Sequence, residues 1–435
     1  RQRNGHSVGS FFRGIQSYSR DIKLFLLYSL IANVGIGVFM LIFNLYLIQL
    51  DLAEDFIGRF NAFSTLAMGG VALSIGFLVN RFGVWLTVTV GLVLFIITSV
   101  LACVITNPPL LLLMGALSGA GTAFLFVPTM PFIVELTTPR ERHSVAALAF
   151  SLNSLSMTIG SLVGGFLPRS LASLLAIDTP SAEAYRYTLI VGVGLAGLGI
   201  IPLLGMSAQQ RHARPMDEDV AIAGGPAPAP PRTVRRHMAV FIAIGGLMSL
   251  GAGALFPFYN VFLQRQGAST REIGVIFSAA GLIAAGFGLT SPYLARRLGS
   301  LKAVTVVRLT PVPFYFLLLF TPALPIAVIA HIVRTTSINM AWPIDSTYIS
   351  EVLPSRARAQ VFSFRSGAWN FGWALSSVIA GALIVRYGYS VSFVAYIVFI
   401  TASMLLYYFY FERTIGERRA TPVAATTDAS ELSVQ

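Results

Sequence analysis

Long apolar segments separated by short polar breaks fill almost the whole chain. A helix needs roughly 20 residues to cross a hydrocarbon core of about 30 Å, and the segments recur at about that length. Twelve can be counted, at residues 24–48, 56–79, 84–106, 110–134, 144–168, 187–206, 237–262, 272–294, 301–320, 325–350, 360–384 and 390–411. This pattern predicts an all-α integral membrane protein with twelve transmembrane helices.

One long hydrophilic segment interrupts the pattern, at residues 207–236. It is rich in Pro and Gly and carries charges of both signs. Such a segment cannot bury enough apolar surface to offset the entropy of ordering, so a flexible linker is expected. The chain then divides into an N-terminal tail with an amphipathic segment, two six-helix halves joined by the linker, and a disordered C-terminal tail. The predicted bounds are 1–23, 24–206, 207–236, 237–411 and 412–435.

The two halves match each other when the sequence is shifted by 216 residues, which indicates an internal duplication. Most matching positions are Gly, Asn, Arg or Glu, which rarely coincide by chance in a chain that is 55% hydrophobic. Residues Gly35, Gly37, Asn44, Ile57, Gly58, Arg81, Gly83, Glu135, Arg142 and Gly165 fall on Gly251, Gly253, Asn260, Ile273, Gly274, Arg297, Gly299, Glu351, Arg358 and Gly381. We therefore expect two six-helix repeats.

The placement of the basic residues distinguishes a membrane protein from one that binds nucleic acid. A mean hydropathy of +0.74 with 11% charged residues places the chain in a bilayer, although a net charge of +12 would suit nucleic acid in a soluble protein. The tails, the linker and the loops on their side hold 21 of the 30 Lys and Arg residues. By the positive-inside rule these regions are cytoplasmic. We expect an inner (plasma) membrane protein with both termini in the cytoplasm and no nucleic-acid partner.

The loop after the second span carries the most specific motif. Residues 76–83 read Gly-Phe-Leu-Val-Asn-Arg-Phe-Gly and resemble the Gly-x-x-x-Asp-Arg-x-Gly signature of the major facilitator superfamily, with Asn80 in place of the acid. The corresponding loop of the second half keeps Arg297 and Gly299. The resemblance extends over roughly residues 20–412. It implies a transporter whose halves rock about a substrate at the middle of the bilayer.

Charged residues at the cytoplasmic ends of the spans form a predicted gate. Arg81 and Glu135, with their repeat counterparts Arg297 and Glu351, are expected to form two latches between helices that are made and broken as the halves rock. Ordinary interfacial charge is the alternative interpretation. The other predicted gate residues are Asn80, Gly83, Arg142, Gly299 and Arg358.

Ionisable residues deep inside the spans occur only in the second half. They are Arg308, His331, Arg334, Asp345 and Arg365, and their repeat counterparts are the uncharged Leu92, Gly115, Ser118, Thr129 and Ala149. A charged side chain at the bilayer centre costs about 2.5–3.5 kcal/mol on insertion scales, so each is a candidate functional residue.

Asp345 and Arg365 are expected to form a pair. At 1.5 Å per residue, each lies about 10 Å from the cytoplasmic face. The pair either fixes two helices or offers one partner for which substrate or a proton competes. Arg334 lies near mid-membrane and is expected to face water unless it meets an anion, which favours a positively biased central cavity and an anionic substrate.

Other polar residues in the spans have two interpretations each. His331 is either a titrating group or a hydrogen-bonded structural histidine. Asn44 and Asn260 either bind substrate or form bonds between helices. Arg308 is expected to extend its side chain to the inner face.

Two residues follow Arg365 near helical spacing. Trp369 and Asn370 are candidates for a polar and aromatic wall of the substrate cavity, with simple packing as the alternative.

Together these features favour a secondary active transporter that works by alternating access. No ATP-binding glycine-rich loop occurs, so energy is expected from a gradient. The overall resemblance is to drug and metabolite exporters, and Gly160, Gly164 and Gly165 resemble an antiporter-associated motif. Proton-coupled efflux of an amphipathic or anionic small molecule is expected. Proton-coupled uptake of an organic anion, or a membrane sensor that binds without transporting, are the alternatives.

An enzyme is not expected from this sequence. The histidines show no metal-ligand spacing and Cys103 stands alone, so no catalytic residue, cofactor or metal is predicted. The expected partners are a small-molecule substrate, a coupling proton and the lipid bilayer, and the protein is expected to be a monomer.

Overall fold

The computed structural model describes residues 18–138, 141–178, 180–207 and 231–420. The predicted amphipathic segment, most of the predicted linker and the last part of the predicted C-terminal tail lie outside the described residues. Their interpretation therefore stays a prediction.

Twelve helices long and apolar enough to cross a membrane occur in the described residues, as predicted. The N-terminal half contains α2 (Arg20–Gln49), α3 (Glu54–Phe82), α4 (Val84–Val104), α5 (Pro108–Phe126), α6 (Thr129–Leu136), α7 (Arg142–Leu175), α8 (Ala182–Leu198) and α9 (Ile200–Leu204). The C-terminal half contains α11 (Arg232–Leu255), η2 (Phe256–Phe258), α12 (Tyr259–Arg265), α13 (Thr270–Gly288), α14 (Ser291–Leu298), α15 (Ser300–Leu309), α16 (Val312–Phe320), α17 (Leu324–Val352), α18 (Ser355–Tyr387) and α19 (Ser390–Ala420). The last helix continues beyond the predicted end of its span at residue 411, through a charged Glu- and Arg-containing segment that favours helix.

Several spans consist of two or three helices in direct succession. The seventh span runs through α11, η2 and α12, and the fourth through α5 and α6. Prolines lie at these junctions, because Pro lacks a backbone N–H and its ring clashes with the preceding turn. Pro128 precedes α6, Pro257 lies within η2 and Pro311 precedes α16.

Two predicted gate glycines are explained by the turns they make. Gly83 and Gly299 each separate two helices and have φ of 83° and 78°. A residue with a side chain is strained at such a positive φ, whereas glycine adopts it without steric clash. Because both positions are equivalent in the repeat, the same sharp turn occurs once in each half.

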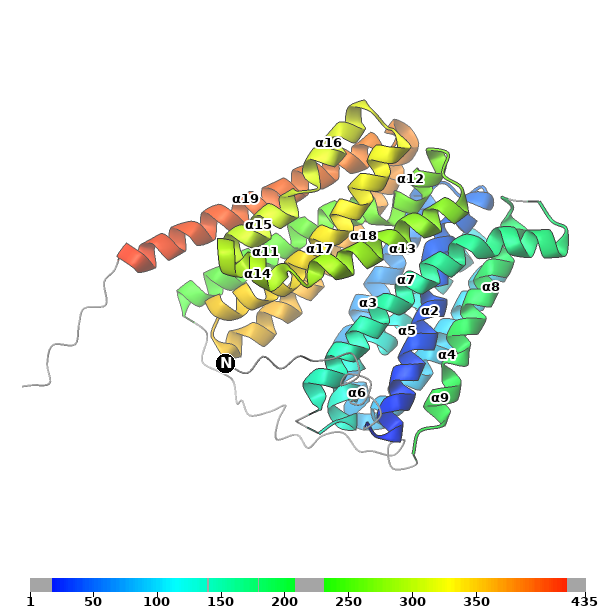
Figure 1. Ribbon diagram of the computed structural model, residues 1–435, viewed down its shortest axis with the longest axis horizontal. Coiled ribbons are helices and arrows are strands. Elements are labelled where there is room, and N and C mark those ends of the chain that lie inside the picture. Colours follow the sequence, from blue (N-terminus) through cyan, green and yellow to red (C-terminus); the bar gives the residue numbers. More distant parts are fainter. Residues whose placement is uncertain (1–17, 139–140, 179, 208–230, 421–435) are drawn as a thin grey trace, which may run out of the picture.

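The two halves are separate bundles that diverge toward one end (Figure 1). We call that end the linker end. There α2 begins beside the end of α9, with Ser207 Oγ donating to Asp21 at 2.7 Å, and α11 begins beside α19, with His237 within 3.0 Å of the Tyr410 hydroxyl. The opposite end, where α2 ends and α3 begins, is called the distal end.

Glycines allow the halves to pack closely toward the distal end. A Cβ on Gly58 of α3 would lie 2.2 Å from the Ser377 carbonyl oxygen of α18, and one on Gly165 of α7 would lie 2.7 Å from the Cα of Gly274 on α13. Gly381 of α18 lies against Glu54 in the same way. These contacts are related by the 216-residue repeat, so the duplication is expressed as two equivalent interfaces.

Candidate functional site

A reciprocal pair of hydrogen bonds joins the halves at the ends of α2 and α12. Asn44 Nδ2 donates to the Pro257 carbonyl at 2.6 Å, and Asn260 Nδ2 donates to the Leu41 carbonyl at 2.7 Å. Both the donors and the acceptors are 216 residues apart, so the two bonds are repeat equivalents. Of the two sequence-based interpretations of these amides, bonding between helices is the one present in this conformation.

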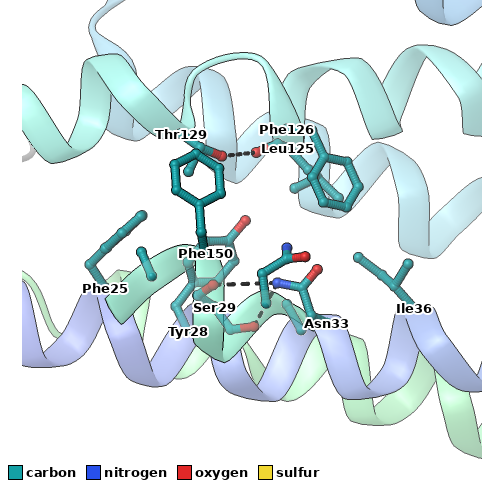
Figure 2. A pocket seen from close by; sticks show the side chains of 12 residues that line it. Phe25, Tyr28, Ser29, Asn33, Ile36, Leu125, Phe126, Thr129 and Phe150 are labelled. Atoms are coloured by element: carbon teal, nitrogen blue, oxygen red, sulfur yellow. Dashed lines mark hydrogen bonds between the residues drawn. The ribbon is translucent and has the colours of Figure 1, made fainter. Parts of the chain in front are cut away.

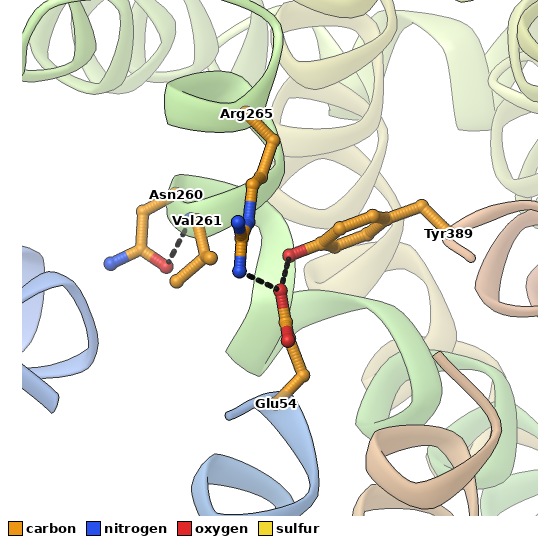
Figure 3. Close-up of polar contacts among 5 residues, drawn as sticks. All are labelled: Glu54, Asn260, Val261, Arg265 and Tyr389. Atoms are coloured by element: carbon orange, nitrogen blue, oxygen red, sulfur yellow. Dashed lines mark hydrogen bonds and ion pairs between the residues drawn. The ribbon is translucent and has the colours of Figure 1, made fainter. Parts of the chain in front are cut away.

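A second connection, the distal clamp, consists of Glu54, Arg265 and Tyr389. The Glu54 carboxylate begins α3 and accepts from Arg265 at 3.2 Å and from the Tyr389 hydroxyl at 2.9 Å, both from the C-terminal half (Figure 3). Burial and the neighbouring Glu54 charge raise the pKa of Tyr389, so the phenol stays protonated as a donor. Sequence reasoning missed this clamp because Glu54 and Tyr389 lie in loops between predicted spans.

A third connection lies on the other flank of the distal end. The Tyr185 hydroxyl of α8 is 2.6 Å from Thr270 Oγ1 at the start of α13, and Gln264 donates to the same hydroxyl at 3.1 Å. Gln264 and Arg265 are neighbours in the chain and reach opposite flanks of the N-terminal half. The distal end is therefore held at three places.

The predicted pair between Asp345 and Arg365 is present inside the C-terminal half. Arg365 Nη2 donates to Asp345 Oδ2, and the Tyr407 hydroxyl donates to Oδ1 at 2.8 Å. Helices α17, α18 and α19 thus meet at one buried carboxylate. Asp345 is held by two donors of different kinds, a guanidinium and a phenol, which the sequence did not indicate.

The prediction that Arg334 faces water is wrong. Its side chain is 5% exposed, and its guanidinium carbon lies 4.2 Å from the Phe256 ring centroid and 4.6 Å from that of Tyr259. Arg334 Nη2 is 2.8 Å from His331 Nδ1, and the His331 ring lies against the rings of Tyr259 and Phe277. Aromatic faces compensate the charge that water was expected to solvate.

The positions of Arg308 and His331 also bear on what was expected from the sequence. Arg308 was expected to reach the inner face, but it is 6% exposed, so that prediction is wrong. His331, enclosed by two rings and Arg334, corresponds in this conformation to the structural alternative.

The predicted polar wall on α18 contains one residue that contacts the other half. Asn370 lies against Gly69 of α3, where a Cβ would be 3.2 Å away, and donates to the Ser366 carbonyl at 3.0 Å. Trp369 packs near Trp373, with ring centroids 6.2 Å apart.

At the linker end, the predicted gate arginines make contacts within their own halves. Arg81 lies over the Phe82 ring at 5.5 Å and Arg297 over the Tyr293 ring at 4.8 Å. The other two donate to nearby backbone: Arg142 to the Val134 carbonyl at 3.4 Å and Arg358 to the Leu353 carbonyl at 2.9 Å. Asn80 and Glu351 are exposed and Glu135 is half-buried. These contacts do not test the two latches, which stay a prediction.

A cavity of about 100 Å³ lies inside the N-terminal half between α2, the α5–α6 junction and α7 (Figure 2). Polar side chains on its walls include Ser29, Asn33, Thr129 and Asn153. Sequence reasoning missed it because no charged residue marks it.

Comparison with known proteins identifies the family of this chain and shows which solved structures share its fold. The sequence model of the Major Facilitator Superfamily matches residues 25–354 and 332–432. Multidrug resistance protein MdtH of Yersinia pestis (strain Pestoides F) is 29% identical over 147 residues, which is 33% of this chain and 37% of that protein. MdtH of Yersinia enterocolitica is 29% identical over 130 residues, or 30% and 32%. The alignments thus span about a third of these relatives' length.

Solved structures match over nearly the whole chain. A variant of the nucleoside transporter NupG has a TM-score of 0.69 at 15% identity and covers 91% of this chain and 99% of its own. A bacterial homolog of the human lysosomal transporter Spinster has a TM-score of 0.68 at 15% identity, with coverages of 92% and 98%. At these identities the likeness concerns the fold.

Proposed function

The chain belongs to the Major Facilitator Superfamily of membrane transporters, and we propose that it is a secondary active transporter that exports an amphipathic or anionic small molecule in exchange for protons. Transport takes place by alternating access, with the two halves rocking about a substrate held between them. The export direction is supported by the partial similarity to multidrug resistance protein MdtH.

One observation carries the proposal of alternating access. Hydrogen bonds between the halves, within the part of the chain that the structure describes, lie between mid-height and the distal end, from Ser278 and Thr158 to the distal clamp. Toward the linker end the two halves diverge (Figure 1). With the basic linker end in the cytoplasm, this corresponds to an inward-open state. Rocking to the outward-open state breaks the distal clamp.

Asp345 is the proposed site of proton coupling. It is the carboxylate that lies deep in a span among the described residues, and its partners come from two other helices. For export by exchange, the ionised Asp345 carboxylate binds a donor group of the amphipathic substrate in place of one of its present partners, and a proton that neutralises Asp345 releases the substrate. Protonation also frees Arg365 to bind an anion, and because proton and anion are then bound together, that route belongs to uptake in the same direction.

Proteoliposomes containing a trapped pH dye test this function. A panel of amphipathic anions, cations and neutral molecules is added, and we expect at least one to drive proton movement saturably. Asp345→Asn should abolish proton movement. Asp55→Asn is the matched control, because it removes a carboxylate from the exposed pair with Arg59. Equal proton movement in wild type and Asp345→Asn would contradict coupling at this residue.

Proton-coupled uptake of an organic anion is the second candidate. Among the described residues of the C-terminal half, Arg308 and Arg334 are buried and Arg365 is 12% exposed, and Asp345 is the one carboxylate beside them deep in a span. This excess of positive charge favours an anion. The same vesicles decide between the two candidates: uptake requires proton and substrate to move in the same direction, whereas export by exchange requires opposite directions.

A further inference from the structure

The cavity in the N-terminal half occupies the place that the ion pair fills in the C-terminal half. Thr129 and Ala149, which line the cavity, are the repeat counterparts of Asp345 and Arg365. In the C-terminal half the Arg365 stem lies directly on α11, since a Cβ on Gly245 would be 2.6 Å from Arg365 Cγ. With a short side chain at Ala149, the equivalent space in the N-terminal half is left open.

One buried acceptor on the cavity wall lacks a partner. Asn33 is 7% exposed, and its Nδ2 donates to the Ser29 carbonyl at 2.7 Å (Figure 2). Because a carbonyl can only accept, this bond orients the amide and leaves Oδ1 as the free atom. Asn33 Oδ1 makes no hydrogen bond. A buried polar atom without a partner is costly, by about 1–3 kcal/mol, so the site favours a ligand that brings a donor.

Aromatic rings form much of the rest of the cavity wall, together with aliphatic side chains. Tyr28, Phe126 and Phe150 are among the lining residues. Phe150 is 55% exposed, so it forms a rim through which the cavity is reached. A cavity needs roughly 10–15 Å³ to hold one water molecule. The volume here is about 100 Å³, so the cavity accommodates a ring-sized group. Flat rings pack well between aromatic side chains.

The charge of the ligand follows from the lining. None of the twelve residues that line the cavity is Asp, Glu, Lys, Arg or His. An anion would lose its hydration without gaining a cation, and an ammonium group would gain aromatic faces but no carboxylate. An uncharged group avoids both penalties.

We propose that this cavity is a substrate subsite for an uncharged, ring-sized group that donates an N–H or O–H to Asn33 Oδ1. The proposal rests on the proposed transport function and deepens it. The substrate then has two unlike ends: a neutral ring with a donor in the N-terminal half, and a polar or anionic end toward Arg365.

Equilibrium dialysis with protein in lipid nanodiscs, without any gradient, tests the subsite. The probes are radiolabelled indole and 1-methylindole, which lacks the N–H donor, and empty nanodiscs correct for partitioning into lipid. We expect wild type to bind indole saturably and about tenfold more tightly than 1-methylindole, the difference that one hydrogen bond provides. Tryptamine, whose ammonium group would meet no carboxylate in the lining, should bind more weakly than indole.

Three variants locate the binding. Asn33→Leu should weaken indole binding about tenfold and leave 1-methylindole unchanged, and Ala149→Met, which fills the cavity, should weaken both. Asn339→Leu is the matched control, because Asn339 is an exposed amide on α17 that bonds within its own helix. Should Asn33→Leu not fold, the comparison of the two probes on wild type and Ala149→Met still decides.

The outcomes separate the subsite from the transport function. Equal affinity for indole and 1-methylindole, or no saturable binding because the cavity holds only water, overturns the subsite. If the binding pattern appears as expected but no gradient ever drives flux, the subsite stands and the transport proposal fails.

Discussion

Gly274 of α13 lies so close to Gly165 of α7 that a Cβ added to it would come within 2.6 Å of the Gly165 Cα. Two spans from opposite halves therefore pack backbone to backbone, which only glycine permits. The equivalent contact between α3 and α18 is made at Gly58 and Gly381. Closure of the distal end depends on these two pairs.

The first prediction concerns that contact. Gly274→Ala places a methyl group against backbone that cannot move aside, and overpacking costs about 1–3 kcal/mol. We expect the variant to shift the halves away from the distally closed state, seen as longer distances between spin labels placed on the two halves. Gly286→Ala on the same helix is the control, since a Cβ there meets nothing within 4 Å. An unchanged distance distribution in Gly274→Ala would contradict the prediction.

The second prediction concerns the reciprocal amides. Asn44→Leu and Asn260→Leu should each weaken the distally closed state by about 0.6 kcal/mol, a typical value for a hydrogen bond between membrane helices. Because the two bonds are repeat equivalents, the two effects should be similar in size. Spin-label distances measure the shift. Asn61→Leu, whose amide bonds within α3, serves as the control and should leave the distances unchanged.

The third prediction concerns the distal clamp. Glu54→Gln should favour the distally open state, by about 0.5–1 kcal/mol because Arg265 is largely exposed and such pairs are weakened by solvent. The raised pKa of Tyr389 gives a pH dependence of the same state. The contribution of protonated Tyr389 to the distally closed state is complete below the ordinary tyrosine pKa of about 10. It declines as the pH rises above that value, because Tyr389 then loses its proton when the clamp opens.

Spin-label distances measured from pH 7 to about pH 11 give the fraction of molecules in the distally closed state and so check the direction of this pH dependence. The closed fraction of wild type should begin to fall above about pH 10, and Tyr389→Phe should show a flatter profile together with a weaker clamp at neutral pH. A wild-type profile that instead gains closure at alkaline pH would refute the assignment.

The fourth prediction separates stability from coupling at Asp345. Asp345→Asn leaves Arg365 charged and without its carboxylate, and breaking a buried pair costs about 3–5 kcal/mol. The double variant Asp345→Asn with Arg365→Met removes both charges, so it should recover much of the lost thermal stability. Proton-coupled flux should stay absent in both. Recovery of flux along with stability would mean that the pair only holds helices together.

Hydropathy and the repeat predicted the architecture well. Twelve apolar segments became twelve spans, and the 216-residue offset predicted which positions would be equivalent in space. The contact between Asp345 and Arg365 was also predictable, because both lie at the same depth on consecutive spans. Depth in the membrane follows from position along a helix and needs no tertiary information.

The direction in which each side chain points around its helix axis could not be predicted, and the two wrong predictions concern this direction. From depth alone, Arg334 was assigned to water and Arg308 to the inner face. Both are buried, and Arg334 lies beneath aromatic rings from α12 and η2. The distal clamp joins residues 335 positions apart, from Glu54 to Tyr389. No local pattern indicates such a contact.

The order of apolar and polar residues was sufficient to specify the spans and the duplicated halves, because each span buries its own backbone hydrogen bonds and is identified by length and composition alone. Packing of the assembled helices decided which polar groups meet. The distal clamp, the aromatic enclosure of Arg334 and the open space beside Ala149 all depend on how side chains from distant segments fill a shared volume. That information exists only once the helices are placed against one another.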